Sequence, residues 1–169
     1  MGIASLHAMP LLAQQADHCR GDAADLPSAD LYCLELLTVP SIPGQVAGHV
    51  ILDLAPGPFT LSVNRDGVIR YRPRAVLMGL PDPATLGATA YVAWAETPLF
   101  DRWVRLGTVR NGITALAPVA FDQFSILISA EADSLVTERT GRLVLRGGSP
   151  STRMLPPDFM EFLTGIIGV

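Results

Sequence analysis

The sequence predicts a mostly β domain: an antiparallel β-sandwich of about eight or nine strands, followed by a short C-terminal amphipathic helix. Three observations predict it. Apolar and polar residues alternate along most of the chain from residue 31 onward. The 15 Gly and 14 Pro are many for 169 residues and favour short strands joined by turns. Apolar residues make up 49% and charged residues 17%, so a core can form and disorder is excluded.

Nine segments have the length and pattern of strands. They are residues 31–38, 47–54, 59–64, 68–78, 89–97, 103–109, 113–119, 123–130 and 142–146. Turn signals separate them at intervals typical of an immunoglobulin-like sandwich.

Two turns and one proline refine this prediction. Asn64-Arg65-Asp66-Gly67 and Arg110-Asn111-Gly112 each predict a hairpin between the strands on either side, because Asp-Gly and Asn-Gly tolerate positive φ. Pro73 has no N–H to donate, so segment 68–78 is expected to be an edge strand or to be interrupted there.

The two ends of the chain differ from this β region, which spans residues 31–150. Residues 1–30 form an apolar and then acidic extension, predicted to be a signal remnant or a docking arm. Residues 151–169 are a loop and a helix whose apolar side chains share one face. The apolar residues expected to pack on the domain, or to dock on a partner or membrane surface, are Leu11, Leu12, Phe159, Phe162, Leu163, Ile166 and Ile167.

Cys19 and Cys33 flank an acidic loop and are candidates for a disulfide, which would indicate an oxidising compartment. Two unrelated buried thiols are one alternative. The other is a copper site that combines the adjacent His18 and Cys19 with His49 or Met9. Adjacent residues diverge on a strand, however, and the spacing matches no known metal clamp, so no metal site is predicted.

No catalytic residue or cofactor site is predicted. The sequence has no Gly-x-Ser-x-Gly elbow and no glycine-rich loop that opens a helix. The carboxylates Asp101, Asp122, Glu131 and Asp133 are scattered. A net charge of −4 argues against nucleic-acid binding, which needs a positive surface.

Two groups of side chains are candidates for partner docking. All 12 basic residues are Arg, and Arg70, Arg72 and Arg74 are spaced to share one face of a strand. They would contact an acidic partner or lipid, protect an exposed edge strand, or be covered by the acidic N-terminal region. Tyr91, Trp94, Phe100 and Trp103 would form an aromatic binding face or pack in the core.

Several segments resemble a known family. Tyr91-Val92-Ala93-Trp94, residues 105–109, 124–131 and 140–150 are similar to the extracytoplasmic C-terminal domain of anti-sigma-K-type factors. The resemblance covers about a third of the chain. It implies a β-sandwich outside the cytoplasmic membrane with no catalytic residues. That family's helical sigma-binding domain with its His/Cys zinc motif is not seen here, so sigma-factor regulation is not implied.

A second resemblance is to the module that precedes the oxidase domains of some bacterial multicopper-oxidase-like proteins. Leu31-Tyr32-Cys33 and residues 146–151 carry it. The sequence has no His-x-His copper motif, so oxidase activity is not implied.

These observations lead to one hypothesis and one alternative. The hypothesis is a non-enzymatic, periplasmic or otherwise extracytoplasmic interaction module, an accessory subunit that docks on a larger, membrane-bound electron-transfer assembly. Its partners would be proteins, with membrane-surface contact through the termini and no nucleic acid. The alternative is a copper- or redox-linked module associated with multicopper-oxidase-like proteins.

Overall fold

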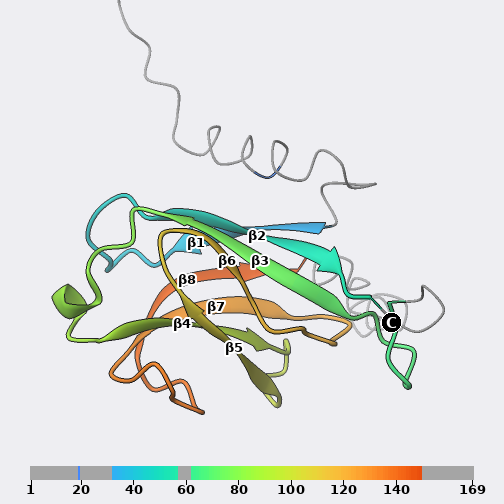
Figure 1. Ribbon diagram of the computed structural model, residues 1–169. Coiled ribbons are helices and arrows are strands. Elements are labelled where there is room, and N and C mark those ends of the chain that lie inside the picture. The colour runs from blue at the N-terminus through green and yellow to red at the C-terminus, as the bar shows by residue number, and fades with distance from the viewer. Residues whose placement is uncertain (1–18, 20–31, 57–61, 150–169) are drawn as a thin grey trace, which may run out of the picture.

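Eight antiparallel strands form one continuous sheet in the computed structural model, which describes residue 19 and residues 32–56 and 62–149 (Figure 1). Along the sheet the order is β5-β4-β7-β8-β1-β2-β3-β6. The strands are β1 (Cys33–Thr38), β2 (Ala47–Leu54), β3 (Tyr71–Met78), β4 (Ala90–Glu96), β5 (Trp103–Val109), β6 (Gly112–Ala115), β7 (Ser125–Glu131) and β8 (Arg142–Gly148). One turn of 3₁₀ helix, η2 (Pro83–Leu86), precedes β4.

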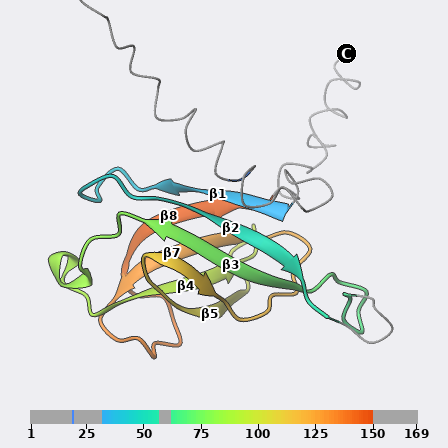
Figure 2. The ribbon, with the colours of Figure 1, turned by 45° about the horizontal axis from the view of Figure 1, so that its top comes forward.

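The sheet bends back on itself into two facing layers (Figure 2). The upper layer in Figure 1 holds β1, β2, β3 and β6, and the lower layer holds β8, β7, β4 and β5. The inward-facing apolar side chains of both layers fill the space between them and form the main core; Leu36, Val50, Leu77, Ile126 and Val144 are completely buried there. This burial removes apolar surface from water and stabilises the fold.

The two edge strands meet without pairing. Among the described residues, one backbone hydrogen bond joins the two edges, from the N–H of Ala117 to the carbonyl of Leu106 at 2.8 Å. The mostly β, antiparallel character predicted from the sequence is therefore confirmed, but the strands form a nearly closed, barrel-like sheet rather than two clearly separate ones. We call the gap between β5 and residues 112–121 the seam.

The Asn64–Gly67 turn forms as predicted. The N–H of Asn64 donates to the carbonyl of Val68 at 2.9 Å, and Gly67 has a φ of +80°. Val63 and Ile69 form an isolated bridge next to it. The rest of the predicted strand 59–64 lies largely outside the described residues.

The second predicted hairpin is wrong. The chain turns at Asn111 and Gly112, but β6 pairs with β3 instead of β5. The amide side chain of Asn111 donates to the Leu80 carbonyl and accepts from the Leu80 N–H, both at 2.9 Å. These bonds tie the turn to the segment that follows β3, and so β6 joins the other layer.

Pro73 does not mark an edge of the sheet. The prediction that segment 68–78 is an edge strand, or is interrupted at Pro73, is therefore wrong. β3 lies between β2 and β6, with Pro73 opposite Leu52. The Pro73 carbonyl accepts from the N–H of Leu116, just beyond the last β3–β6 pair. The nitrogen and oxygen of a strand residue point to the same side, so the nitrogen of Pro73 faces the end of the β3–β6 ladder. Its missing N–H therefore interrupts neither the β2–β3 ladder nor the β3–β6 ladder.

The terminal predictions, an extension over 1–30 and an amphipathic helix within 151–169, lie outside the described residues apart from Cys19. Their apolar docking candidates, Leu11, Leu12, Phe159, Phe162, Leu163, Ile166 and Ile167, therefore stay predictions. Within the described part of the chain, no helix has the length and apolar character needed to cross a membrane.

Candidate functional site

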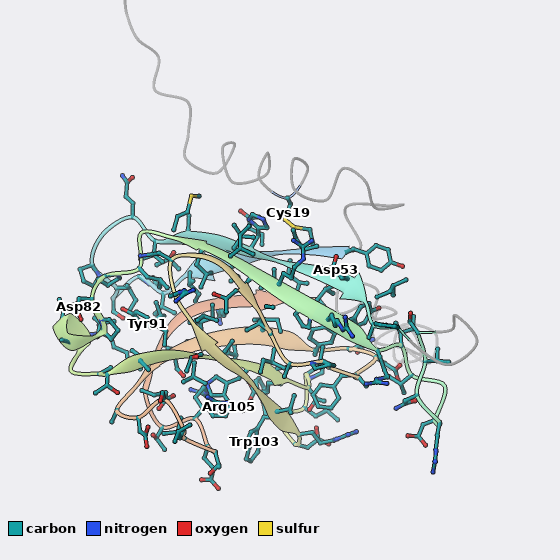
Figure 3. All side chains as sticks on the ribbon, viewed as in Figure 1. Cys19, Asp53, Asp82, Tyr91, Trp103 and Arg105 are labelled. Atoms are coloured by element: carbon teal, nitrogen blue, oxygen red, sulfur yellow. A yellow bond between two sulfur atoms is a disulfide. The ribbon has the colours of Figure 1, made fainter. Side chains whose placement is uncertain are left out.

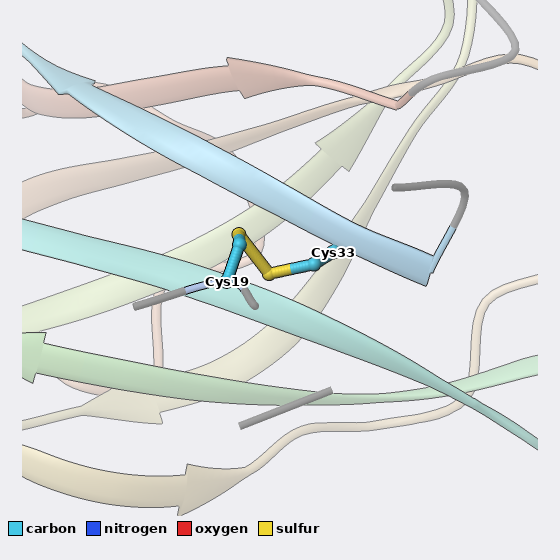
Figure 4. Close-up of a disulfide and its surroundings, with 2 residues drawn as sticks. All are labelled: Cys19 and Cys33. Carbon is cyan, nitrogen blue, oxygen red and sulfur yellow. A yellow bond between two sulfur atoms is a disulfide. The ribbon is translucent and has the colours of Figure 1, made fainter. Parts of the chain in front are cut away.

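Cys19 and Cys33 form a disulfide, as the sequence predicts, with Cα atoms 5.6 Å apart. It lies over β2 on the face of the layer that points away from the core (Figure 4). Cys33, Ile51 and Val76 pack with Cys19 into a small apolar cluster there. In this state neither sulfur is a thiolate, the form in which cysteine binds a metal.

Arg70, Arg72 and Arg74, the predicted docking group that we call the arginine ridge, are only partly available to a partner. Arg72 and Arg74 share the outer face of β3, while Arg70 precedes the strand. The guanidinium of Arg74 binds the carboxylate of Asp53 on β2 through two hydrogen bonds, Nε to Oδ2 at 2.5 Å and Nη2 to Oδ1 at 3.3 Å. The ridge as a docking surface for an acidic partner stays a prediction, and its Arg74 already has a carboxylate partner within the sheet.

The four aromatic residues considered as a binding face separate into two groups. Tyr91 belongs to the main core. Trp94 is also buried, but on the outer face of the lower layer, where it packs with Val92 and Leu127. Phe100 and Trp103 are 71% and 51% exposed, and they lie together around the turn that joins β4 to β5.

This turn displays apolar side chains to solvent. Leu99 and Phe100 at its tip are 83% and 71% exposed, and Trp103 and Val104 follow at the start of β5. We call these four residues the apex. Phe100 has a φ of +58°, the only positive φ of a non-glycine residue in the described part of the chain. A bulky residue seldom adopts this strained conformation, and strain of this kind is concentrated at functional sites.

Hydrogen bonds hold the apex turn in this conformation. The N–H of Phe100 donates to the Thr97 carbonyl at 2.9 Å, and the Thr97 hydroxyl donates to the carboxylate of Asp101 at 2.6 Å. The second bond lowers the pKa of Asp101 below its ordinary value, so this carboxylate is ionised and keeps accepting at neutral pH. Arg102 stacks over the Phe121 ring, 4.9 Å from its centroid, and anchors the turn to the far side of the seam.

The seam opens beside the apex. A groove of about 460 Å³ lies between residues 101–104 and residues 118–121. The carbonyl of Arg102 accepts from the N–H of Thr97 at 3.0 Å, so strand alternation directs the backbone N–H and C=O of the next residue, Trp103, away from β4. These groups face the groove. The start of β5 therefore offers an unpaired strand edge beside exposed apolar side chains.

Below the apex, a loop of residues 132–141 folds over the outer face of the lower layer. The buried carboxylate of Glu131 holds it, because Oε2 accepts from the N–H of Gly141 at 2.7 Å and from the Thr140 hydroxyl at 3.2 Å. Its Oε1 accepts from the Ser129 hydroxyl at 2.5 Å, and Ser129 in turn accepts from the indole N–H of Trp94 at 2.9 Å. The chain of hydrogen bonds fixes Trp94 and the loop together.

A pocket of about 270 Å³ lies between this loop and the apex. Its lining consists of Trp94, Glu96, Trp103, Leu127, Glu138 and Arg139. Figure 3 shows Trp103 on β5 with its side chain on the face away from the upper layer. A register shift at Ala93 and Trp94 lets Trp103 lie opposite Glu96.

The described residues hold no group of three or more His, Cys, Asp or Glu side chains placed to bind a metal ion. His49, named as a copper ligand in the alternative hypothesis, is a buried residue of β2. The two cysteines of that hypothesis are joined to each other.

Comparisons with protein-family models, with curated proteins and with solved structures give no match. The resemblances to anti-sigma-K-type domains and to multicopper-oxidase-associated modules stay predictions. A function for this chain therefore has to be inferred from its own geometry.

Sequence reasoning missed most of this site. Glu96, Glu138 and Arg139 carry no motif, and Leu99 lies between the predicted strands 89–97 and 103–109. One signal was present: Leu99 and Phe100 directly follow Pro98, and two large apolar residues in a proline turn are unusual where polar residues dominate.

Proposed function

We propose that this chain is a non-enzymatic interaction module that works outside the cytoplasm and docks as an accessory subunit on a larger assembly. The observation that carries the proposal is the apex: four exposed apolar side chains on the hydrogen-bonded β4–β5 turn and the start of β5, beside an unpaired strand edge. Exposed apolar side chains gathered at one end of a domain are typical of protein–protein contact sites. The disulfide supports an oxidising compartment.

The partner that fits is an extended segment of another protein. A strand laid along β5 would pair with the backbone groups of Trp103 and place apolar side chains in the groove next to Val104. Main-chain hydrogen bonds would supply affinity, while the apolar contacts would exclude water. The resemblance to an extracytoplasmic β domain without catalytic residues agrees with this role.

Site-specific photo-crosslinking in the source cell tests the proposal. A photoreactive residue at Leu99 is expected to capture one defined partner, and one at Ala84 is not. Ala84 is exposed on η2, which precedes β4, whereas the apex follows it, so the two sites lie at opposite ends of that strand. The Phe100→Asp variant should lose the adduct at position 99. Equal capture at both sites, or an adduct that survives Phe100→Asp, contradicts docking at the apex.

A further inference from the structure

The pocket beside the apex is built from two cross-strand pairs and one loop. Trp94 and Leu127 are register neighbours on β4 and β7 and form its floor. Glu96 and Trp103, neighbours on β4 and β5, form one wall. The opposite wall consists of Glu138 and Arg139, which belong to the loop that Glu131 holds. At about 270 Å³ the pocket suits a single side chain, since pockets for drug-sized ligands begin near about 300 Å³.

The floor has no free hydrogen-bond donor, and the accessible aromatic ring is that of Trp103. Trp94 is 1% exposed, and its indole N–H is already used by the Ser129 hydroxyl. The ring of Trp103 stands at the side and is half exposed. The electron-rich faces of tryptophan rings attract cations more strongly than those of any other side chain.

The walls add negative charge. Glu96 and Glu138 bring two carboxylates against the one guanidinium of Arg139. Within the described part of the chain, neither Glu96 nor Glu138 has an ion pair or a side-chain hydrogen bond. A carboxylate beside an aromatic ring favours a cation, whereas an anion would face repulsion from both glutamates.

We propose that this pocket binds the guanidinium or ammonium group of a basic side chain carried by the partner segment that pairs with β5. The inference rests on the proposed function and deepens it. Side chains of a strand alternate between faces, so an added strand would place one set on the face of Val104 and the other set on the face of Trp103, which is also the face of the pocket. The recognised segment therefore alternates apolar and basic residues.

Tryptophan fluorescence reports directly on this pocket, because Trp94 and Trp103 are the only two tryptophans of the chain and both line it. The probes are the peptides acetyl-Val-Arg-Val-Arg-Val-amide, its Val-Ser and Val-Glu counterparts, and methylguanidinium alone. We expect the Arg peptide to change the emission and to bind at least about tenfold more tightly than the Ser peptide, with the Glu peptide weakest.

The Glu96→Gln/Glu138→Gln variant is expected to remove this preference for Arg over Ser. Its matched control is Glu35→Gln, on the outer face of β1 in the other layer, which should leave the preference unchanged. Equal affinity for the Arg and Ser peptides, or no change in emission with any probe, overturns the proposal of a cation pocket.

Two further outcomes separate this inference from the proposed function. Slower hydrogen exchange of β5 with all three peptides, without a preference for Arg, supports docking at β5 and overturns the cation pocket. Methylguanidinium binding as tightly as the Arg peptide overturns recognition through a strand, since the backbone then adds nothing, and identifies the pocket as a site for small organic cations.

Discussion

At the scale of single residues, Glu131 links the sheet to the loop that covers it. Its side chain is completely buried, but its carboxylate accepts hydrogen bonds from Ser129, Thr140 and Gly141. A buried carboxylate is tolerated only when such donors replace water. Glu131 therefore holds the end of the loop, while Arg105 holds its start by donating to the Ser134 carbonyl at 2.5 Å, and the pocket wall formed by Glu138 and Arg139 depends on the loop.

Glu131→Ala should destabilise the protein by about 3 kcal/mol, because the buried hydroxyl of Ser129 and the loop donors of Thr140 and Gly141 lose their acceptor. Glu138→Ala, in the same loop but exposed, should change the free energy of unfolding by less than about 0.5 kcal/mol. Urea denaturation measures both. A Glu131→Ala protein as stable as the Glu138→Ala protein would show that the loop is not held by this carboxylate.

Tyr91 makes a different residue-scale prediction, about alkaline pH. Burial, and to a smaller extent the charge of Asp82, raises the pKa of the Tyr91 phenol above 10.0. A raised pKa means that the folded state favours the neutral phenol, so this contribution to stability is complete below pH 10 and is lost as the pH rises through the folded-state value.

Tyr91→Phe removes both this titration and the hydrogen bond from the hydroxyl to the Pro81 carbonyl at 3.0 Å. We expect it to cost about 1 kcal/mol at pH 8 and less at pH 11.5. Chemical denaturation at the two pH values gives the difference. A cost that is the same at both would show that Tyr91 does not titrate differently in the folded and unfolded chains.

At the scale of elements, the disulfide and β1 have to be considered together. β1 joins the two layers, because it pairs with β2 on one side and with β8 on the other. The link to β8 is short, with two residue pairs, Leu37 with Arg146 and Thr38 with Leu145. The cross-link at Cys33 lies at the opposite end of the strand and limits its movement there.

Reduction of the disulfide is expected to lower the free energy of unfolding by about 3 kcal/mol, the value the chain-entropy model assigns to a closed loop of about 15 residues. Guanidinium denaturation with and without dithiothreitol measures this. The Cys19→Ala/Cys33→Ala variant should match the reduced protein and be insensitive to the reductant. Unchanged stability on reduction would show that the cross-link does not restrain the unfolded chain.

At the scale of the whole molecule, the strands were predictable and their partners were not. Alternation is a local property, so segments such as 47–54 and 103–109 are strands at the predicted positions. Pairing depends on contacts between residues far apart in the sequence. Asn111 binds Leu80, and β6 therefore pairs with β3 and not with β5. The pocket could not be predicted from local sequence either, because Glu96 and Glu138 are brought together only when the loop folds over Trp94.

The nearly closed sheet has an unequal distribution of stability. β4 and β7 are paired on both sides and carry mostly buried residues, whereas β5 and β6 are each paired on one side only. Amides exchange with solvent by local opening, and the least supported segments open first. Across the seam a single backbone bond, Ala117 to Leu106, opposes that opening in the described part of the chain.

Hydrogen exchange of the isolated protein should therefore be fastest at β6 and the start of β5, and slowest at β4 and β7. Ala117→Pro, which removes the donor across the seam, should speed exchange of β5 and leave β7 unchanged. Mass spectrometry of peptides from each strand resolves the pattern. Protection of β5 equal to that of β7 at low protein concentration would mean that the seam is already closed in solution, and an edge that is closed cannot receive the partner strand proposed for it.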